Sequence, residues 1–171
     1  MSKKTSSYKT LFILRHAKSS WNDHQLSDFE RPLNRRGYEQ APQIAEVLSK
    51  KTTLPQKVIS SPANRALTTA NFMLELLPEK VKLKTDPRIY EATVNALLYQ
   101  IQEISDTKDC VMIVGHNPGF SDLVNVLSQQ KMPPLPTCAL VELRLNIEHW
   151  SEAMPECATL IGFDKPPKNP A

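Results

Sequence analysis

Two arginines and two histidines stand where the chain leaves predicted strands of a sheet. Arg15 and His16 directly follow one apolar run, and His116 comes just after another. Arg65 lies in the first turn of a predicted helix, where a cation opposes the helix dipole unless an anion is bound between them. Because the carboxyl ends of neighbouring parallel strands meet at one edge of a sheet, we expect the four side chains to converge. Guanidinium groups match phosphate oxygens bidentately, so the set predicts a pocket for a phosphoryl group.

The paired imidazoles indicate a mechanism for that pocket. A neutral imidazole can attack phosphorus in line when its other nitrogen donates to a fixed acceptor, and the second imidazole can donate to the developing charge. The arginines would supply the charge stabilisation that Mg²⁺ supplies in kinases, so no metal and no cofactor are expected. Zinc ligation by His16 and His116 is disfavoured, because no third ligand stands at a usual spacing and the arginines repel a cation.

Each of these residues also has a purely structural interpretation. A lone histidine at a strand end is more often structural, a lone arginine such as Arg65 is most often in a surface ion pair, and the Gly-His-Asn-Pro-Gly turn is explicable by turn chemistry. The conjunction of the four residues favours the chemical interpretation. His24 and His149 lie in polar stretches and are expected to be exposed.

Three further residues are candidates for the site. Glu91 precedes a helix that Thr93 is expected to cap, so its carboxylate is either an acid or a group stabilised by the helix dipole. Asn22, in an irregular stretch that follows His16, and Asn117 are candidate substrate-binding residues.

Strands and helices must position these residues, and the sequence predicts that the two kinds of element alternate along the chain. Strands are predicted at Leu11–Leu14, Lys57–Ser60, Val81–Thr85, Cys110–Val114, Cys138–Leu145 and Ala158–Phe163. Helices are predicted at Arg35–Lys50, from Ser61-Pro62, after Thr93 and after the turn Gly115–Gly119. This order predicts a three-layer α/β/α fold around a mostly parallel sheet, with the last two strands antiparallel. Residues 18–34 are predicted to be a long functional loop beside His16.

Length and composition bound the remaining possibilities. The chain has 171 residues and a net charge of +3, which suits one domain over residues 10–163, with a flexible leader at 1–9 and an extended tail at 164–171. Three scattered cysteines favour buried reduced thiols. The weak charge and the lack of a long apolar segment argue against nucleic acid and membrane as partners. We therefore expect a cytoplasmic protein, most simply a monomer.

Several blocks of the sequence resemble the histidine phosphatase superfamily, the phosphoglycerate mutase-like family. The matching blocks are, in order, Arg15-His16-Ala17, Arg31-Pro32-Leu33 with Arg36-Gly37, Ser60-Ser61-Pro62 with Arg65-Ala66 and Thr69-Ala70, and Gly115-His116-Asn117-Pro118-Gly119. The similarity runs from about Thr10 to Phe163, and within the superfamily it is greatest to the small phosphohistidine phosphatases of the SixA type. Ala17 stands where many members have glycine.

The resemblance implies a phosphatase without metal or cofactor. It implies that His16 becomes phosphorylated, that Arg15, Arg65 and His116 hold the phosphoryl group, and that water then attacks the phosphoenzyme. In mutase-like members a glutamate near the position of Glu91 protonates an alcohol leaving group, whereas the SixA type manages without a dedicated acid because imidazole leaves more easily. The expected substrate is a phosphohistidine protein, the alternatives being a small phosphomonoester and a non-catalytic phosphate-binding docking module.

Overall fold

A single six-stranded sheet runs through the computed structural model, which describes residues 7–167. The strands are β1 (Lys9–Arg15), β2 (Lys57–Ser60), β3 (Lys82–Thr85), β4 (Cys110–Gly115), β5 (Leu140–Leu145) and β6 (Ala158–Asp164). They lie in the order β3-β2-β4-β1-β5-β6; the first four are parallel, and β5 is antiparallel to both of its neighbours, β1 and β6. The expected antiparallel pair is therefore confirmed, and β3 forms one edge of the sheet.

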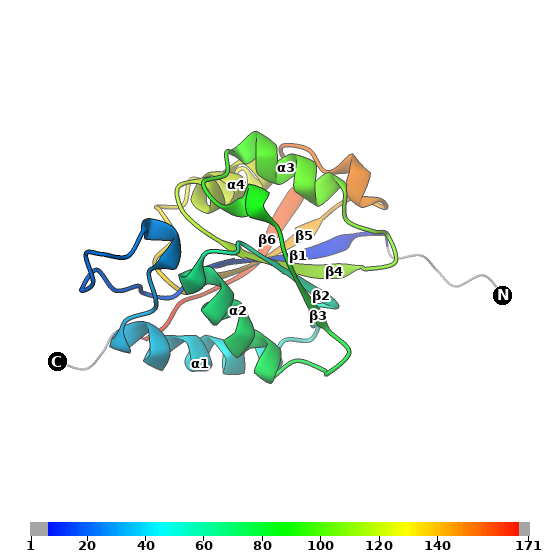
Figure 1. Cartoon of the computed structure of the whole chain (residues 1–171). Helices are drawn as coiled ribbons and strands as arrows, with labels where there is room; N and C mark the ends of the chain where they lie inside the picture. Colours follow the sequence, from blue (N-terminus) through cyan, green and yellow to red (C-terminus); the bar gives the residue numbers. More distant parts are fainter. Residues whose placement is uncertain (1–6, 168–171) are drawn as a thin grey trace.

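Two pairs of helices cover the two faces of this sheet (Figure 1). The helices are α1 (Arg35–Ser49), α2 (Asn64–Glu75), α3 (Val94–Gln102) and α4 (Gly119–Ser128), and the short 3₁₀ turns are η1 (Asp28–Glu30), η2 (Pro87–Ile89) and η3 (Trp150–Glu152). Helices α1 and α2 lie on one face, and α3 and α4 lie on the other. The predicted three-layer fold is confirmed.

Strand β1 is buried on both faces and divides the apolar core in two. Leu11 and Ile13 pack toward α3 and α4, and Phe12 and Leu14 pack toward α1 and α2. All four side chains are inaccessible to solvent, and burial of each contributes about 1.5–3 kcal/mol. The strand that carries Arg15 at its end is thus held from both sides of the sheet.

Helix α2 begins later than the sequence predicts. Ser61 does not cap it: its hydroxyl oxygen accepts a hydrogen bond from the Ala63 amide at 3.2 Å, and the helix begins at Asn64. A local serine turn thus competes with the capping position. Thr93 does cap α3, where it accepts from the Ala96 amide, as predicted.

Other boundaries differ by one or two residues. Cys138 has a φ of 61°, a left-handed conformation that a strand does not tolerate, so β5 begins only at Leu140. Lys9 and Asp164, which the sequence assigned to the leader and the tail, belong to β1 and β6. The rest of the expected leader, up to residue 6, and residues 168–171 of the expected tail lie outside the described residues.

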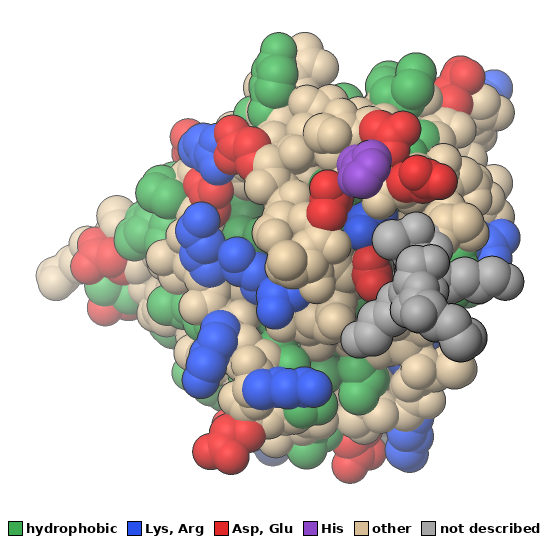
Figure 2. Space-filling model, turned by 90° about the vertical axis from the view of Figure 1, so that its right-hand side faces the viewer, with side chains coloured by type: hydrophobic (Ala, Val, Ile, Leu, Met, Phe, Trp, Pro, Cys, Tyr) green, Lys and Arg blue, Asp and Glu red, His purple; other side chains and the backbone are tan. Residues whose placement is uncertain are grey.

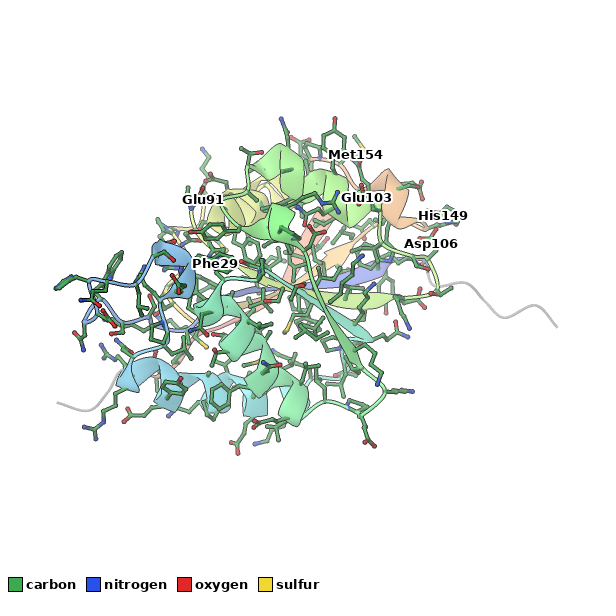
Figure 3. The ribbon with its side chains drawn as sticks, in the orientation of Figure 1. Phe29, Glu91, Glu103, Asp106, His149 and Met154 are labelled. Carbon is green, nitrogen blue, oxygen red and sulfur yellow. The ribbon has the colours of Figure 1, made fainter. Side chains whose placement is uncertain are left out.

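The three cysteines are free thiols. Cys110 and Cys138 are buried and Cys157 is half-buried; burial raises the pKa of the Cys138 thiol to about 12. His24 and His149 are exposed, as predicted, and His149 pairs with Asp106 at the end of the molecule opposite the loop 18–34 (Figure 3). Within residues 7–167 no helix is long and apolar enough to cross a membrane.

Candidate active site

The two predicted site histidines lie side by side because β1 and β4 are neighbouring parallel strands. Arg15 pairs in register with Gly115, so the next residue of each strand is a histidine at the same edge of the sheet. The His16 amide donates to the Gly115 carbonyl at 3.0 Å, and the two imidazole centroids are 5.2 Å apart. The convergence expected for this pair is confirmed.

The His16 ring is held in one orientation by a backbone carbonyl. Its Nδ1 lies 2.7 Å from the carbonyl oxygen of Ala17, so Nδ1 carries the proton and donates it, and Nε2 keeps a free lone pair. Burial lowers the pKa of this imidazole to about 3, and the charges of Arg65 and Arg15 act in the same direction. His16 is therefore a neutral imidazole at neutral pH, the form required of a nucleophile.

The second imidazole is fixed by Ser61. His116 Nε2 lies 2.7 Å from Ser61 Oγ, whose oxygen already accepts from the Ala63 amide. The serine hydroxyl has no other acceptor within residues 7–167, so it donates to Nε2 and places the imidazole proton on Nδ1. Within residues 7–167 this Nδ1 is buried without a partner, so it is free to donate to a bound anion. Burial lowers the pKa of His116 to about 4, with Arg65 acting in the same direction.

The two arginines approach from different elements. Arg15 donates from Nη1 to the carbonyl oxygen of Leu135 at 2.7 Å, while its Nε is buried without a partner among the described residues. Arg65, in the first turn of α2, is buried beside the strand ends. Thr69 holds α2 against the site, because its Oγ1 accepts from the Ala17 amide at 3.0 Å and donates to the Arg65 carbonyl.

Asp28, on η1 of the loop 18–34, binds the guanidinium group of Arg65. Its backbone carbonyl accepts from Arg65 Nη1 at 2.6 Å, and its Oδ2 accepts from Arg65 Nη2 at 3.0 Å. The same carboxylate accepts from the Tyr90 hydroxyl at 2.5 Å and from Arg31 at 2.9 Å. The Tyr90 hydrogen bond and the two guanidinium groups lower the pKa of Asp28 to about 2. The loop is therefore tied to the site through an ionised carboxylate.

These side chains surround a cavity of about 350 Å³. Its lining residues are Arg15, His16, Lys18, Ser19, Trp21, Asp28, Arg31, Arg65, His116, Asn117 and Thr137. Four of them are cations and one is an anion, so the cavity favours an anionic ligand. The exposed Trp21 ring lies over the Arg31 guanidinium, with 3.2 Å between the guanidinium carbon and the ring centroid. This contact places an aromatic surface at the rim of the cavity.

Of the other three candidate residues, only Asn117 lines this cavity, and Asn22 and Glu91 lie outside it. Asn117 lines the cavity, but its amide donates to the Leu135 carbonyl and accepts from Ser121, so it is engaged in holding the segment before β5 to α4. Asn22 lines a separate surface pocket next to α1. Glu91 is exposed and lies beside α3 and α4 (Figure 3), where it and His116 line a neighbouring pocket.

Sequence reasoning missed four residues that shape the site. Asp28, Ser61 and Thr69 each bind one of the predicted groups or its backbone, and Tyr90 binds Asp28. Ser61 and Thr69 lay within blocks of the family resemblance, which was a usable signal. No local pattern marked Asp28 or Tyr90, because their hydrogen bond joins segments 62 residues apart.

Comparison with known proteins agrees with this geometry. Residues 11–119 match the family model of the histidine phosphatase superfamily, branch 1. An uncharacterized chloroplastic protein of Arabidopsis thaliana is 32% identical over 162 residues, which cover 87% of this chain and 72% of that protein.

Two SixA structures share the fold. One, from Agrobacterium tumefaciens and provisionally described as a phosphohistidine phosphatase, has 24% identity and a TM-score of 0.79, with 93% of this chain and 99% of that one covered. The other, the protein histidine phosphatase SixA complexed with tungstate, has 23% identity and a TM-score of 0.76, with 92% and 97% covered. With a family match over more than half of its length and a site formed by the matching blocks, this chain belongs to the histidine phosphatase superfamily.

Proposed function

We propose that the protein is a phosphatase that removes the phosphoryl group from phosphohistidine on a partner protein, without a metal ion or cofactor. The observation that carries this proposal is the state of His16: a neutral ring whose Nδ1–H is bound by the Ala17 carbonyl and whose Nε2 is free, beside Arg15, Arg65 and His116. The tungstate bound to the related SixA structure supports an oxyanion in such a site.

The reaction runs in two displacements. His16 Nε2 attacks phosphorus, the bond from phosphorus to the departing group breaks, and that group leaves with its electron pair. Water then attacks phosphorus of the phosphorylated His16, which releases inorganic phosphate and restores the imidazole. Arg15 and Arg65 neutralise the equatorial oxygens in both steps, and His116 Nδ1–H donates to one of them. Asp28 accepts from two of the Arg65 N–H groups, so the phosphoryl group binds the remaining ones or competes with Asp28.

The choice of phosphohistidine follows from the acids at the cavity. Asp28 has a pKa of about 2 and is ionised at neutral pH, so it has no proton to give. Glu91 is not among the residues that line the cavity. An alcohol leaving group needs a proton from an acid, whereas imidazole has a pKa of about 6.5 and leaves more easily.

The decisive experiment traps the phosphoenzyme. The protein is incubated with a labelled phosphodonor and quenched, and the label is expected to be acid-labile and base-stable. It should be absent from His16→Ala and present in His24→Ala, a matched change of an exposed histidine. Label that persists in His16→Ala would overturn the assignment of the nucleophile, and binding of phosphopeptide without turnover would favour a docking module.

Hydrolysis of a small phosphomonoester is the second candidate, and the position of Glu91 favours it. His116 lines both the main cavity and a neighbouring pocket of about 440 Å³ that Glu91 also lines. An alcohol portion that extends past His116 would reach this carboxylate. In that case Glu91→Gln lowers turnover of alkyl phosphates far more than turnover of phosphohistidine, and an equal loss on both substrates contradicts the acid role.

A further inference from the structure

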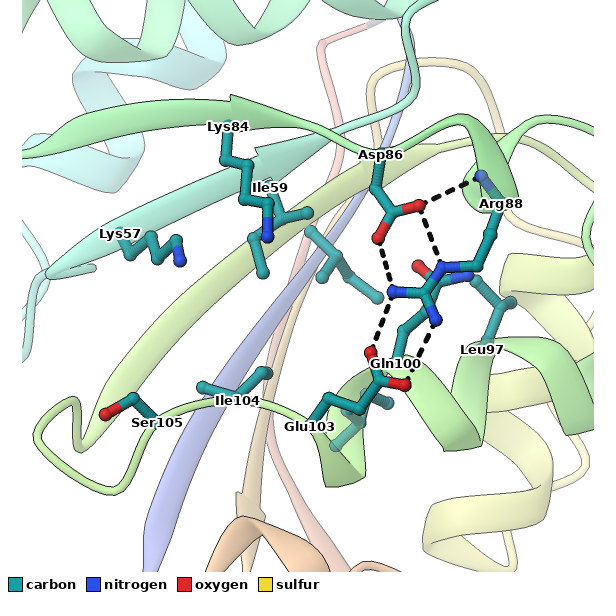
Figure 4. A pocket seen from close by; sticks show the side chains of 12 residues that line it. Lys57, Ile59, Lys84, Asp86, Arg88, Leu97, Gln100, Glu103, Ile104 and Ser105 are labelled. Carbon is teal, nitrogen blue, oxygen red and sulfur yellow. Dashed lines mark hydrogen bonds and ion pairs between the residues drawn. The ribbon is translucent and has the colours of Figure 1, made fainter.

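A second cavity lies on the face of the sheet that carries α3, at the corner formed by β2 and β3 (Figure 4). Helix α4 packs on β1 and β6, and α3 packs on α4 and η2, which leaves this side of β2 and β3 largely without a helix over it. The cavity measures about 170 Å³ and shares no lining residue with the active-site cavity. It is a separate place in the fold.

The floor of this second cavity is apolar. Ile59 of β2 pairs in register with Ile113 of β4, so the two side chains form a row across the sheet. Leu97 and Ile101 of α3 and Ile104 after it close the cavity from the helical side. A cavity of about 150 Å³ with apolar walls accommodates a ring the size of benzene. The available space therefore fits one six-membered ring or a branched chain of similar size.

One wall of the cavity carries two free cations. Lys84 of β3 pairs in register with Ile59, so it lies in the same row across the sheet. Lys57 stands two residues before Ile59 on the same face (Figure 4). Neither ammonium group has an ion-pair or hydrogen-bond partner within residues 7–167. Lysine on an edge strand protects the edge from pairing, which accounts for Lys84 on β3. It does not account for Lys57, because β2 lies inside the sheet between β3 and β4.

The opposite wall carries both signs of charge. Arg88 is paired with Asp86 at 2.8 Å and with Glu103 at 2.8 Å, and its other nitrogens complete both contacts. One guanidinium and two carboxylates leave this wall with a net charge of −1, so the two lysines give the whole lining of the cavity a net charge of +1. Lysine and arginine side chains also gather on the end of the molecule shown in Figure 2, which faces away from the active-site loop. A bound anion would be attracted to the lysine wall.

A buried amide in this cavity lacks a partner. Gln100 of α3 lines it and is only 9% exposed, and its Nε2 has no hydrogen-bond acceptor within the described residues. Figure 4 shows the side chain reaching from α3 toward the space beside Arg88. A buried donor without an acceptor is unfavourable and uncommon in native proteins. A ligand that carries an acceptor group would satisfy it.

We propose that this cavity binds a small carboxylic acid with a compact apolar body. The apolar body, a single ring or a branched chain, rests on Ile59 and Ile113. The carboxylate accepts hydrogen bonds from Lys57 and Lys84, and the Gln100 amide donates to an acceptor on the ligand. Nucleotides are too large for this space, and a bare inorganic anion would leave the apolar floor uncovered.

The experiment uses the full chain, labelled with ¹⁵N, and three probes that share size or charge. Benzoate has the ring and the carboxylate, benzamide has the ring without the charge, and inorganic phosphate has charge without the ring. We expect benzoate to cause saturable shifts of amide signals in β2, β3 and α3 and of the Gln100 side chain. Benzamide and phosphate should bind this region at least about tenfold more weakly.

A matched pair of lysine variants tests the recognition of the carboxylate. Lys84→Gln and Lys82→Gln remove the same charge from the same strand, but only Lys84 lines the cavity. Lys84→Gln should weaken benzoate binding about tenfold, and Lys82→Gln should change it less than twofold, with phosphatase activity retained in both. The proposal is overturned if the two variants bind benzoate alike, if the shifts gather around His16 and Arg65, or if no saturable shift occurs.

Discussion

At the scale of single residues, the site works by fixing where protons reside. The Ala17 carbonyl holds the proton of His16 on Nδ1, and the Ser61 hydroxyl leaves the proton of His116 on its own Nδ1. In the proposed mechanism one imidazole is thereby a nucleophile toward phosphorus and the other a hydrogen-bond donor toward oxygen. Two chemically identical side chains would take different roles because their hydrogen-bond partners differ.

Ser61→Ala tests this assignment. Without the hydroxyl, His116 Nε2 loses its partner and the ring can adopt either tautomer or rotate, so we expect kcat to fall about 10- to 100-fold. Ser128→Ala is the control, since Ser128 is also buried but its hydroxyl donates to the Val124 carbonyl within α4. Steady-state kinetics on phosphohistidine peptide measures both variants. Equal kcat values would contradict the role of Ser61.

Asp28→Asn tests the competition between the loop and the ligand. The amide keeps the size of the side chain but removes the negative charge that offsets Arg65 and Arg31, so oxyanions should bind more tightly. We expect the inhibition constant of tungstate to fall about tenfold. Asp23→Asn in the same loop is the control, because Asp23 is exposed and its carboxylate accepts from the Gln25 amide, away from Arg65. An unchanged or higher inhibition constant in Asp28→Asn would contradict the prediction.

At the scale of elements, the start of the loop 18–34 is held by the first turn of α1. A Cβ built on Gly37 would lie 2.2 Å from the carbonyl oxygen of Lys18, which also accepts from the Asn34 amide. Asn34 caps α1 through its side chain, which accepts from the Gly37 amide at 2.9 Å. The helix and the segment after His16 therefore share one close backbone contact.

Gly37→Ala should disturb this contact. The methyl group must displace the Lys18 backbone, so we expect the free energy of unfolding to fall by about 1–3 kcal/mol and KM to rise because Lys18 lines the active-site cavity. Gly162→Ala is the control, since its Cβ would meet nothing closer than 3.6 Å. Urea unfolding and kinetics measure the two effects. A Gly37→Ala protein as stable and active as Gly162→Ala would contradict this account.

The elements also show what the sequence could and could not predict. Strands such as β1 and β4 were predictable, because continuous apolar runs of that length are typical of strands buried on both faces. Convergence of Arg15, His16 and His116 then followed from parallel pairing. The start of α2 was predicted wrongly, because Ser61 bonds an amide two residues on in place of capping. The engagement of Asp28 was beyond prediction, since it depends on how a folded loop meets Arg65.

At the scale of the whole molecule, burying neutral histidines couples the site to stability. His16 has a pKa of about 3 in the fold against about 6.5 in an unfolded chain. Between pH 3 and 6.5 the unfolded chain binds one more proton at His16 than the folded chain does, so protonation favours unfolding. The contribution of the neutral His16 to the free energy of unfolding is therefore fully present above about pH 6.5. It is lost as the pH falls toward 3, at about 1.4 kcal/mol per pH unit.

His16→Gln should reduce this dependence. Glutamine does not titrate, so the loss of unfolding free energy between pH 7.5 and 4.5 should be about 3 kcal/mol smaller than in the unchanged protein. His24→Gln, at an exposed position, should follow the unchanged protein. Urea unfolding at the two pH values gives the comparison. An identical loss in His16→Gln would show that the pKa of His16 is the same in the folded and unfolded chain, which contradicts its burial as a neutral ring.

The contact between Asp28 and Arg65 has a consequence for turnover. The carboxylate is part of the chain and remains close to Arg65 whenever phosphate is bound, so its effective concentration there is high and independent of dilution. In the proposed reaction Asp28 competes with inorganic phosphate for the Arg65 guanidinium, and this competition would favour release of the product.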